Sequence, residues 1–212
     1  MSDTYDSIKL KIKELYADSS LRFGNSSRGV GWKDETSHEL RLRMISEVGI
    51  SDGCSVLDVG CGYGALWEHL VRRGVKGIKY TGIDIVENLT EMARKRFRDS
   101  AKFEVADIME LDQEFDYVLN LGIFNVKLDS RDVEFLEHFV KPILLKMWAL
   151  AKVGVAASFM TDMVDYKNRN LYYASPSEIF NFLRERLSRH VSLRHDYGLY
   201  EFTAYVYKHA KS

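Results

Sequence analysis

The segment VLDVGCGYG, residues 56–64, constrains the fold of this chain more than any other feature of its sequence. Asp58 lies near the end of an apolar run, and Gly60, Gly62 and Gly64 follow at every second position before a helical pattern begins. Glycine lets the backbone turn tightly and approach a ligand closely. The N-terminus of a helix adds free N–H groups and the positive end of its dipole. The segment therefore predicts a strand, a ligand-binding turn and a helix.

Strand-like and helix-like stretches alternate through the rest of the chain, which is typical of a parallel sheet covered by helices. The last two predicted strands are joined only by a short connection around Gly198, so they must be antiparallel. We therefore expect an α/β fold with a doubly wound seven-stranded sheet, mostly parallel, with an antiparallel C-terminal pair. The predicted strands span residues 54–59, 79–85, 102–106, 117–121, 153–160, 191–197 and 202–207.

The N-terminal residues 1–50 are predicted to form a helical cap or lid in front of a domain of residues 51–212. Apolar residues at helical spacing predict a first helix, and the glycine-rich residues 19–35 predict a loop after it. Thr36 and Glu39 form a capping-box pattern, which predicts the start of a second helix.

Composition and charge exclude several classes of protein. Lys and Arg total 30 and Asp and Glu total 31, so the net charge of -1 weighs against a broad nucleic-acid surface. Lys146 and Lys152 interrupt the longest apolar stretch, so we expect no membrane span, and Pro142 should kink or split its helix. The two cysteines, Cys54 and Cys61, and the lack of a secretory pattern predict a reducing, cytoplasmic setting.

Polar side chains follow the next three predicted strands at the point where each one ends. Asp84 ends the second strand, Asp107 follows the third, and Asn120 lies at the end of the fourth. This edge is where open α/β sheets bind ligands. A carboxylate at Asp84 can accept hydrogen bonds from both ribose hydroxyls, and Asp107 can accept one from the exocyclic amine of adenine.

These motifs, in this order, resemble those of class I S-adenosylmethionine-dependent methyltransferases over roughly residues 40–210. The resemblance implies a Rossmann-like fold, S-adenosyl-L-methionine as cofactor and a methyl-transfer activity of class EC 2.1.1. It also implies where the methionine part, the ribose and the adenine of the cofactor bind. The residues implied for this site are Asp58, Gly60, Cys61, Gly62, Gly64, Asp84, Ile85, Asp107, Ile108, Asn120 and Leu121.

Several functional alternatives stay open beside this interpretation. An NAD site would favour G-x-G-x-x-G, whereas this chain has G-x-G-x-G. The acceptor is expected to be a polar small molecule methylated by in-line displacement, but a protein or RNA acceptor and a non-catalytic cofactor-binding protein are the alternatives. No metal is expected, because Asp162, Asp165 and Asn168 match a metal-dependent catechol-type site only loosely. The oligomeric state is not predicted.

Two segments are predicted to form the acceptor pocket. One is the loop of residues 19–35, with Arg22, Arg28 and Trp32. The other is residues 161–175, a long connection without a pattern of its own, which is often a functional lid.

The catalytic residue is left open among four candidates. Tyr172, Tyr173 and Asp162 belong to the second of these segments, and His195 to the sixth predicted strand. His38, at the start of the second helix, either reaches the cofactor pocket or lies at the surface.

Overall fold

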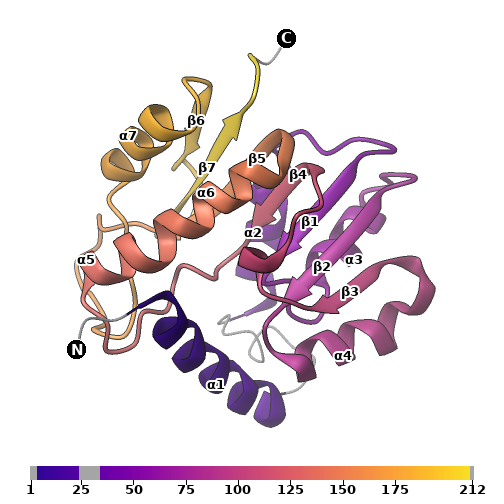
Figure 1. The fold of residues 1–212 in the computed structure, drawn as a ribbon, viewed down its shortest axis with the longest axis horizontal. Helices are drawn as coiled ribbons and strands as arrows, with labels where there is room; N and C mark the ends of the chain where they lie inside the picture. Colours follow the sequence, from indigo (N-terminus) through magenta and orange to yellow (C-terminus); the bar gives the residue numbers. More distant parts are fainter. Residues whose placement is uncertain (1–3, 24–33, 211–212) are drawn as a thin grey trace.

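One seven-stranded sheet runs through the molecule in the order β3-β2-β1-β4-β5-β7-β6 (Figure 1). Strands β1 to β5 are parallel, and β7 runs antiparallel to both of its neighbours, β5 and β6. The fold predicted from the sequence is therefore confirmed. In this computed structural model, which describes residues 4–23 and 34–210, the strands are β1 (Ser55–Val59), β2 (Lys79–Asp84), β3 (Lys102–Val105), β4 (Phe115–Asn120), β5 (Ala151–Met160), β6 (Val191–Arg194) and β7 (Glu201–Tyr207).

Helices cover both faces of this sheet. Helix α6 crosses in front of the sheet in Figure 1, whereas α2 and α3 lie behind it. Apolar residues of α1, α6 and α7 belong to one core cluster, and those of α2, α3 and α4 to the other. The helices are α1 (Tyr5–Phe23), α2 (Glu35–Ser46), α3 (Ala65–Arg72), α4 (Glu87–Phe97), α5 (Asp132–Phe135), α6 (Lys141–Leu150) and α7 (Pro176–Arg186).

The central strands are apolar on both faces because both faces are covered. Along β1, Leu57 and Val59 join the cluster under α6, whereas Val56 joins the opposite cluster. Along β5, Val155 belongs to the cluster under α6 and Ala156 to the opposite cluster. This period of two, in strands without a polar face, is typical of parallel sheets in doubly wound folds.

The start of α2 differs from the prediction. The capping box of Thr36 and Glu39 is wrong, because the helix begins at Glu35 and Asp34 caps it. The Asp34 carboxylate accepts a hydrogen bond from the backbone N–H of Ser37 at 2.8 Å. An aspartate with extended backbone is a strong helix cap, and here it comes two residues before the threonine.

The loop predicted over residues 19–35 begins later than expected. Helix α1 continues to Phe23, so the first part of that segment, including Arg22, is helical. The rest of the segment, with Arg28 and Trp32, lies outside the described residues.

The helix predicted around Pro142 changes its winding just before that residue, and a kink at Pro142 itself stays a prediction. A π-helical turn, Leu136–Val140, separates α5 from α6, and Pro142 occupies the first turn of α6. Proline has no N–H for the helical hydrogen bonds, and the first turn of a helix is the position that tolerates this.

Both helices of the predicted cap pack into the cores of the sheet. Ile8 and Ile12 of α1 belong to the cluster under α6, and Leu42 and Ile45 of α2 belong to the cluster on the other face. A domain boundary at residue 50 stays a prediction.

Candidate functional site

A cavity lies at the carboxyl ends of the parallel strands, where the strand order reverses between β1 and β4. Doubly wound sheets bind their ligands at this switch point. Helix α1, together with His38 and Leu42 of α2, forms the wall opposite the sheet. The residues that line the cavity are Tyr5, Lys9, Ile12, Tyr16, His38, Leu42, Asp58, Val59, Gly60, Cys61, Gly62, Tyr63, Ala65, Leu66, Ile83, Asp84, Ile85, Val86, Leu89, Ala106, Asp107, Ile108, Leu121, Gly122, Ile123, Phe139 and Ile143.

The glycine turn follows a path that side chains would block. Gly60 and Gly62 have φ angles of 77° and 54°, in the left-handed region. A Cβ atom on Gly60 would lie 2.2 Å from Cγ2 of Ile123. The backbone N–H groups of Gly60 and Cys61 donate to the carbonyl oxygen of Ile83 at 2.8 and 3.0 Å, which ties the turn to β2. The turn can therefore bring its backbone close to a ligand.

Asp84 presents its carboxylate to the cavity from the end of β2. Oδ1 accepts a hydrogen bond from the N–H of Val86 at 2.9 Å, and Oδ2 accepts one from Gly62 at 3.0 Å. Burial raises the pKa of Asp84 to about 6, although these backbone hydrogen bonds oppose the shift. Each oxygen has a second lone pair, so the carboxylate can also accept two hydroxyl groups from a ligand.

Asp58 is a second buried carboxylate on the cavity wall. The Tyr80 hydroxyl donates a hydrogen bond to its Oδ2 at 2.5 Å. Burial raises the pKa of Asp58 to about 7; the Tyr80 hydrogen bond opposes this shift, and the nearby Asp84 carboxylate adds to it. A positively charged ligand group beside Asp58 would favour its ionised form.

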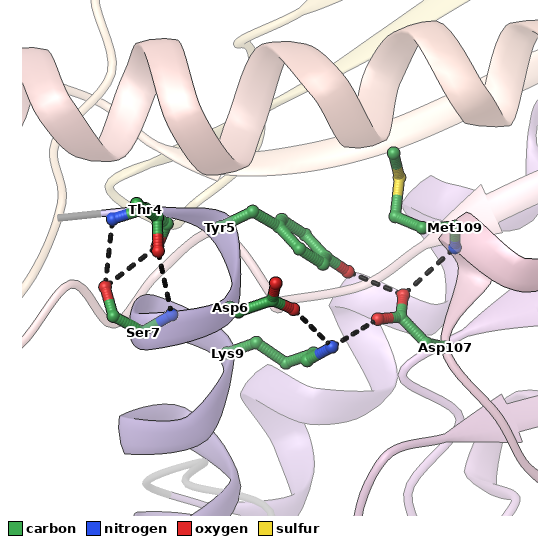
Figure 2. Close-up of polar contacts among 7 residues, drawn as sticks. All are labelled: Thr4, Tyr5, Asp6, Ser7, Lys9, Asp107 and Met109. Atoms are coloured by element: carbon green, nitrogen blue, oxygen red, sulfur yellow. Dashed lines mark hydrogen bonds and ion pairs between the residues drawn. The ribbon is translucent and has the colours of Figure 1, made fainter.

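Asp107 follows β3 and faces α1, from which Tyr5 and Lys9 reach toward it (Figure 2). Its Oδ1 accepts hydrogen bonds from the Tyr5 hydroxyl at 2.6 Å and from the Met109 N–H at 3.0 Å. Its Oδ2 pairs with Nζ of Lys9 at 2.9 Å. Burial alone would raise the pKa of Asp107, but the bonds from Tyr5, Lys9 and Met109 outweigh it and hold the pKa below its ordinary value.

Asn120 is fully buried at the end of β4. Its side-chain oxygen accepts a weak hydrogen bond from Ile123 N–H at 3.3 Å, and its Nδ2 has no partner among the described residues. Asn120 and Gly64 are the two predicted cofactor residues that do not line the cavity. At Gly64 a Cβ atom would lie 2.7 Å from the Phe97 ring, so this glycine lets the start of α3 pack closely against α4. The remaining predicted residues all line it, so the set fits a nucleoside-bearing cofactor.

The four catalytic candidates lie outside this cavity. Tyr172 is 4% exposed and packs in the core, with its ring centroid 5.1 Å from that of Phe135. The Tyr173 hydroxyl accepts a hydrogen bond from Asn168 N–H at 3.1 Å. Their catalytic role stays a prediction, and the geometry of the cavity does not support it.

The other two catalytic candidates, Asp162 and His195, also lie away from the cavity. Asp162 is half-buried, and its N–H donates to the carbonyl of Ala174 at 3.0 Å. The expectation that His195 belongs to the sixth strand is wrong, because β6 ends at Arg194. His195 is exposed in the connection to β7, and its ring forms a T-shaped pair with Phe202 at a centroid distance of 5.9 Å.

The sequence interpretation missed the contribution of α1. Tyr5, Lys9, Ile12 and Tyr16 form a stripe along this helix, and all four line the cavity. The apolar spacing predicted the helix but not the surface against which it packs. Lys9, a charged residue within an otherwise apolar stripe, was the available indication that this face of α1 meets a polar site.

His38 also belongs to the cavity wall, which decides between its two predicted positions. It is 4% exposed, and its Nδ1 lies 3.4 Å from the Tyr63 hydroxyl oxygen. Burial lowers the pKa of His38 to about 4. The imidazole is therefore neutral at pH 7 and is a weaker base than an ordinary histidine.

Within residues 4–23 and 34–210, no group of three or more His, Cys, Asp or Glu side chains is arranged to hold a metal ion. None of the helices described there is long and apolar enough to span a membrane.

Comparison with known proteins identifies the family. A family model described as a methyltransferase domain matches residues 56–142. The Rv1506c protein of Mycobacterium tuberculosis (strain ATCC 25618 / H37Rv), which carries a provisional methyltransferase name, is 39% identical over 163 residues. This match covers 76% of the present chain and 97% of the mycobacterial protein.

Two solved structures show the same fold at low sequence identity. Magnesium protoporphyrin IX methyltransferase from Synechocystis PCC 6803, solved with bound S-adenosylmethionine, is 16% identical with a TM-score of 0.67, covering 93% of this chain and 97% of its own. Phosphoethanolamine N-methyltransferase 1 from Haemonchus contortus is 13% identical with a TM-score of 0.68, covering 97% of this chain and 50% of its own. With the motif order, the sheet topology and the mycobacterial relative, these findings show that the chain belongs to the class I S-adenosylmethionine-dependent methyltransferases.

Proposed function

We propose that this enzyme transfers the methyl group of S-adenosylmethionine to a polar small-molecule acceptor by in-line displacement. The observation that carries the proposal is that the glycine turn, Asp84 and Asp107 line one cavity, which α1 and α2 close on the side opposite the sheet. A cavity with walls on both sides suits a small molecule better than a folded protein or RNA.

The cofactor residues follow from their places around this cavity. Asp84 accepts the ribose hydroxyls, and Asp107 accepts the exocyclic amine of adenine, with Ile108 beside the ring. The glycine turn and Asp58 hold the methionine end, near Leu121. When bound, the cofactor supplies a methyl group on a positively charged sulfur, which is an excellent leaving group.

The protein contributes alignment and exclusion of water. Ile12, Leu42, Ile123, Phe139 and Ile143 form apolar parts of the cavity wall. Apolar walls expel water and strengthen electrostatic interactions within the site. Holding acceptor and methyl donor in line lowers the barrier by removing the entropic cost of their encounter.

The acceptor class rests on the cavity and on the names of two neighbours in the fold. Magnesium protoporphyrin IX and phosphoethanolamine, which those names state as substrates, are both small molecules. A protein or RNA acceptor and a non-catalytic binding protein are the alternatives, and we expect no nucleic-acid partner. Both cysteines are free thiols, which suits a reducing, cytoplasmic setting.

Calorimetric titration with S-adenosylmethionine tests the cofactor site. We expect binding by the wild type and a loss of about 100-fold in Asp84→Asn, because hydrogen bonds to a charged group contribute about 1.5–3 kcal/mol each. Asp99→Asn, at an exposed position, is the matched control and should bind normally. Binding of NAD in place of S-adenosylmethionine would contradict the proposal.

A labelled-methyl screen of metabolite, protein and RNA fractions from cell extract then tests the acceptor. Label in the metabolite fraction supports a small-molecule acceptor. Label only in protein or RNA would overturn that part of the proposal, and tight cofactor binding without label in any fraction would indicate a non-catalytic protein.

A further inference from the structure

The contact between α1 and Asp107 brings residues nearly a hundred positions apart into one polar cluster (Figure 2). Tyr5 and Lys9 reach the carboxylate from α1, and the Met109 N–H reaches it from the turn after β3. Lys9 is also held by Asp6 at 2.9 Å. Tyr5, Lys9 and Asp107 all line the cavity, so the cluster forms part of the ligand site.

Apolar contacts already dock α1 on the protein. Ile8 and Ile12 are 1% and 5% exposed, and the Tyr5 ring stacks on Phe139 at 5.6 Å. Each such buried side chain contributes about 1.5–3 kcal/mol, whereas a partly buried ion pair is weak evidence for stability. The polar cluster is therefore better explained by the ligand site than by helix docking.

The hydrogen bonds leave one position on Asp107 for a ligand. A carboxylate offers about four lone-pair sites, two on each oxygen. Oδ1 accepts from both Tyr5 and Met109, and Oδ2 accepts from Lys9. Among the described residues, one lone pair on Oδ2 remains, beside the cavity.

We propose that Tyr5 and Lys9 are positioning residues that make Asp107 selective for a 6-amino purine. They hold the carboxylate in one orientation and keep it ionised, so that it can only accept a hydrogen bond. The exocyclic amine of adenine donates to such a group, whereas the carbonyl oxygen of hypoxanthine at the same position is repelled by it. This inference rests on the proposed function, because it requires Asp107 to face the base of the cofactor.

The role of the two residues follows from what their loss would do to Asp107. Burial alone raises its pKa, and the bonds from Tyr5 and Lys9 counter that effect. Without them the buried carboxyl group would be freer to rotate, and its pKa would rise. A protonated carboxyl can donate to the hypoxanthine oxygen, so the preference for adenine would shrink.

The test compares S-adenosylhomocysteine with its deaminated analogue, S-inosylhomocysteine, by calorimetric titration of the full chain. We expect the wild type to prefer the adenine ligand, and Tyr5→Phe and Lys9→Met each to reduce that preference about tenfold. Both substitutions keep the apolar part of the side chain, so Phe139 and α1 should stay packed; melting curves check this. Lys11→Met is the control on the same helix: it removes an ion pair with the distant Asp129 and should keep the wild-type ratio.

A purely structural role would weaken both ligands equally and leave their ratio unchanged, which would overturn the proposal. Tighter binding of the adenine ligand by Lys9→Met would overturn it as well, because Lys9 would then compete with the base. In an Asp107→Asn background, Lys9→Met should no longer change the ratio; a further change would also contradict the proposal. If the wild type binds neither ligand, the proposed function fails first, and this inference fails with it.

Discussion

At Asp58, burial and ligand binding act in opposite directions. The folded protein raises the pKa of this carboxyl group to about 7, mainly by burial. The unfolded chain ionises near the ordinary value of about 3.9. The folded state therefore prefers the protonated form, and that contribution to stability is present below about pH 4 and lost as the pH rises through about 7.

Asp58→Asn removes the cost of an ionised carboxylate and keeps an oxygen that can accept from Tyr80. We expect the variant to match the wild type in unfolding free energy near pH 4 and to exceed it by up to about 4 kcal/mol at pH 8. Its affinity for S-adenosylmethionine should fall at least tenfold, because the charge opposite the cofactor's positive groups is lost. Denaturant unfolding at both pH values and calorimetric titration measure these effects. An equal stability difference at pH 4 and pH 8 would contradict the assigned pKa shift.

Side-chain environments were the part of the site that sequence could not supply. Asp84 and Asp107 were predicted from their positions after strands, which is local information. The burial of Tyr172 and His38 depends on contacts with distant elements, Phe135 for the first and Tyr63 for the second. A tyrosine in a loop-like segment looks the same in sequence whether it faces a ligand or the core.

At the scale of elements, the sheet was predictable because strands buried on both faces are nearly continuous apolar runs. Their ends shifted by one to three residues where polar flanking residues gave no sharp signal, as at β6, which ends at Arg194 and not at residue 197. The predicted N-cap of α2 was wrong because Asp34 and Thr36 are both residue types that suit an N-cap position. The packing of α1 over the cavity is a long-range contact that a helical pattern does not encode.

The glycine turn is the element whose geometry is most sensitive to a single substitution. Gly60 and Gly53 have nearly equal φ angles, 77° and 78°. A Cβ atom would meet nothing within 4 Å at Gly53, but it would lie 2.2 Å from Ile123 at Gly60. The two positions therefore separate the cost of the backbone conformation from the cost of the contact.

We expect Gly53→Ala to lose about 1–2 kcal/mol of unfolding free energy, the usual cost of a left-handed residue with a side chain. Gly60→Ala should lose a further 1–3 kcal/mol or so from overpacking and should bind S-adenosylmethionine poorly. Denaturant unfolding and calorimetric titration of both variants provide the comparison. Equal losses of stability together with unchanged affinity in Gly60→Ala would show that the turn does not approach the cofactor.

For the whole molecule, the question is whether residues 1–50 form a separable cap. Helix α1 buries Ile8 and Ile12, whereas the segment around α2 buries Leu42, Ile45 and Val48 at 4%, 0% and 0% exposure. The Tyr205 hydroxyl of β7 also donates a hydrogen bond to the Met44 carbonyl at 2.6 Å. The two helices thus belong to opposite faces of the sheet, and a single cut at residue 50 would open both cores.

The energies of these contacts predict different outcomes for two truncations. At about 1.5–3 kcal/mol for each buried apolar side chain, removal of residues 1–23, with Ile8 and Ile12, costs roughly 3–6 kcal/mol. Removal of residues 1–50, which also takes away Leu42, Met44, Ile45 and Val48, costs about 9–18 kcal/mol. The second figure is as large as the whole free energy of unfolding of a typical domain, which is about 5–15 kcal/mol.

We therefore expect the chain without residues 1–23 to fold with a lower melting temperature and weaker binding of S-adenosylhomocysteine, and the chain without residues 1–50 to remain unfolded. Circular dichroism melting curves and calorimetric titration distinguish these outcomes. A folded fragment of residues 51–212 with wild-type affinity would establish the boundary at residue 50 and would show that α1 and α2 only cover the site. Failure of that fragment, with retention of fold in the shorter truncation, would make α2 part of the methyltransferase domain and leave α1 alone as the cover over the nucleoside end of the cofactor.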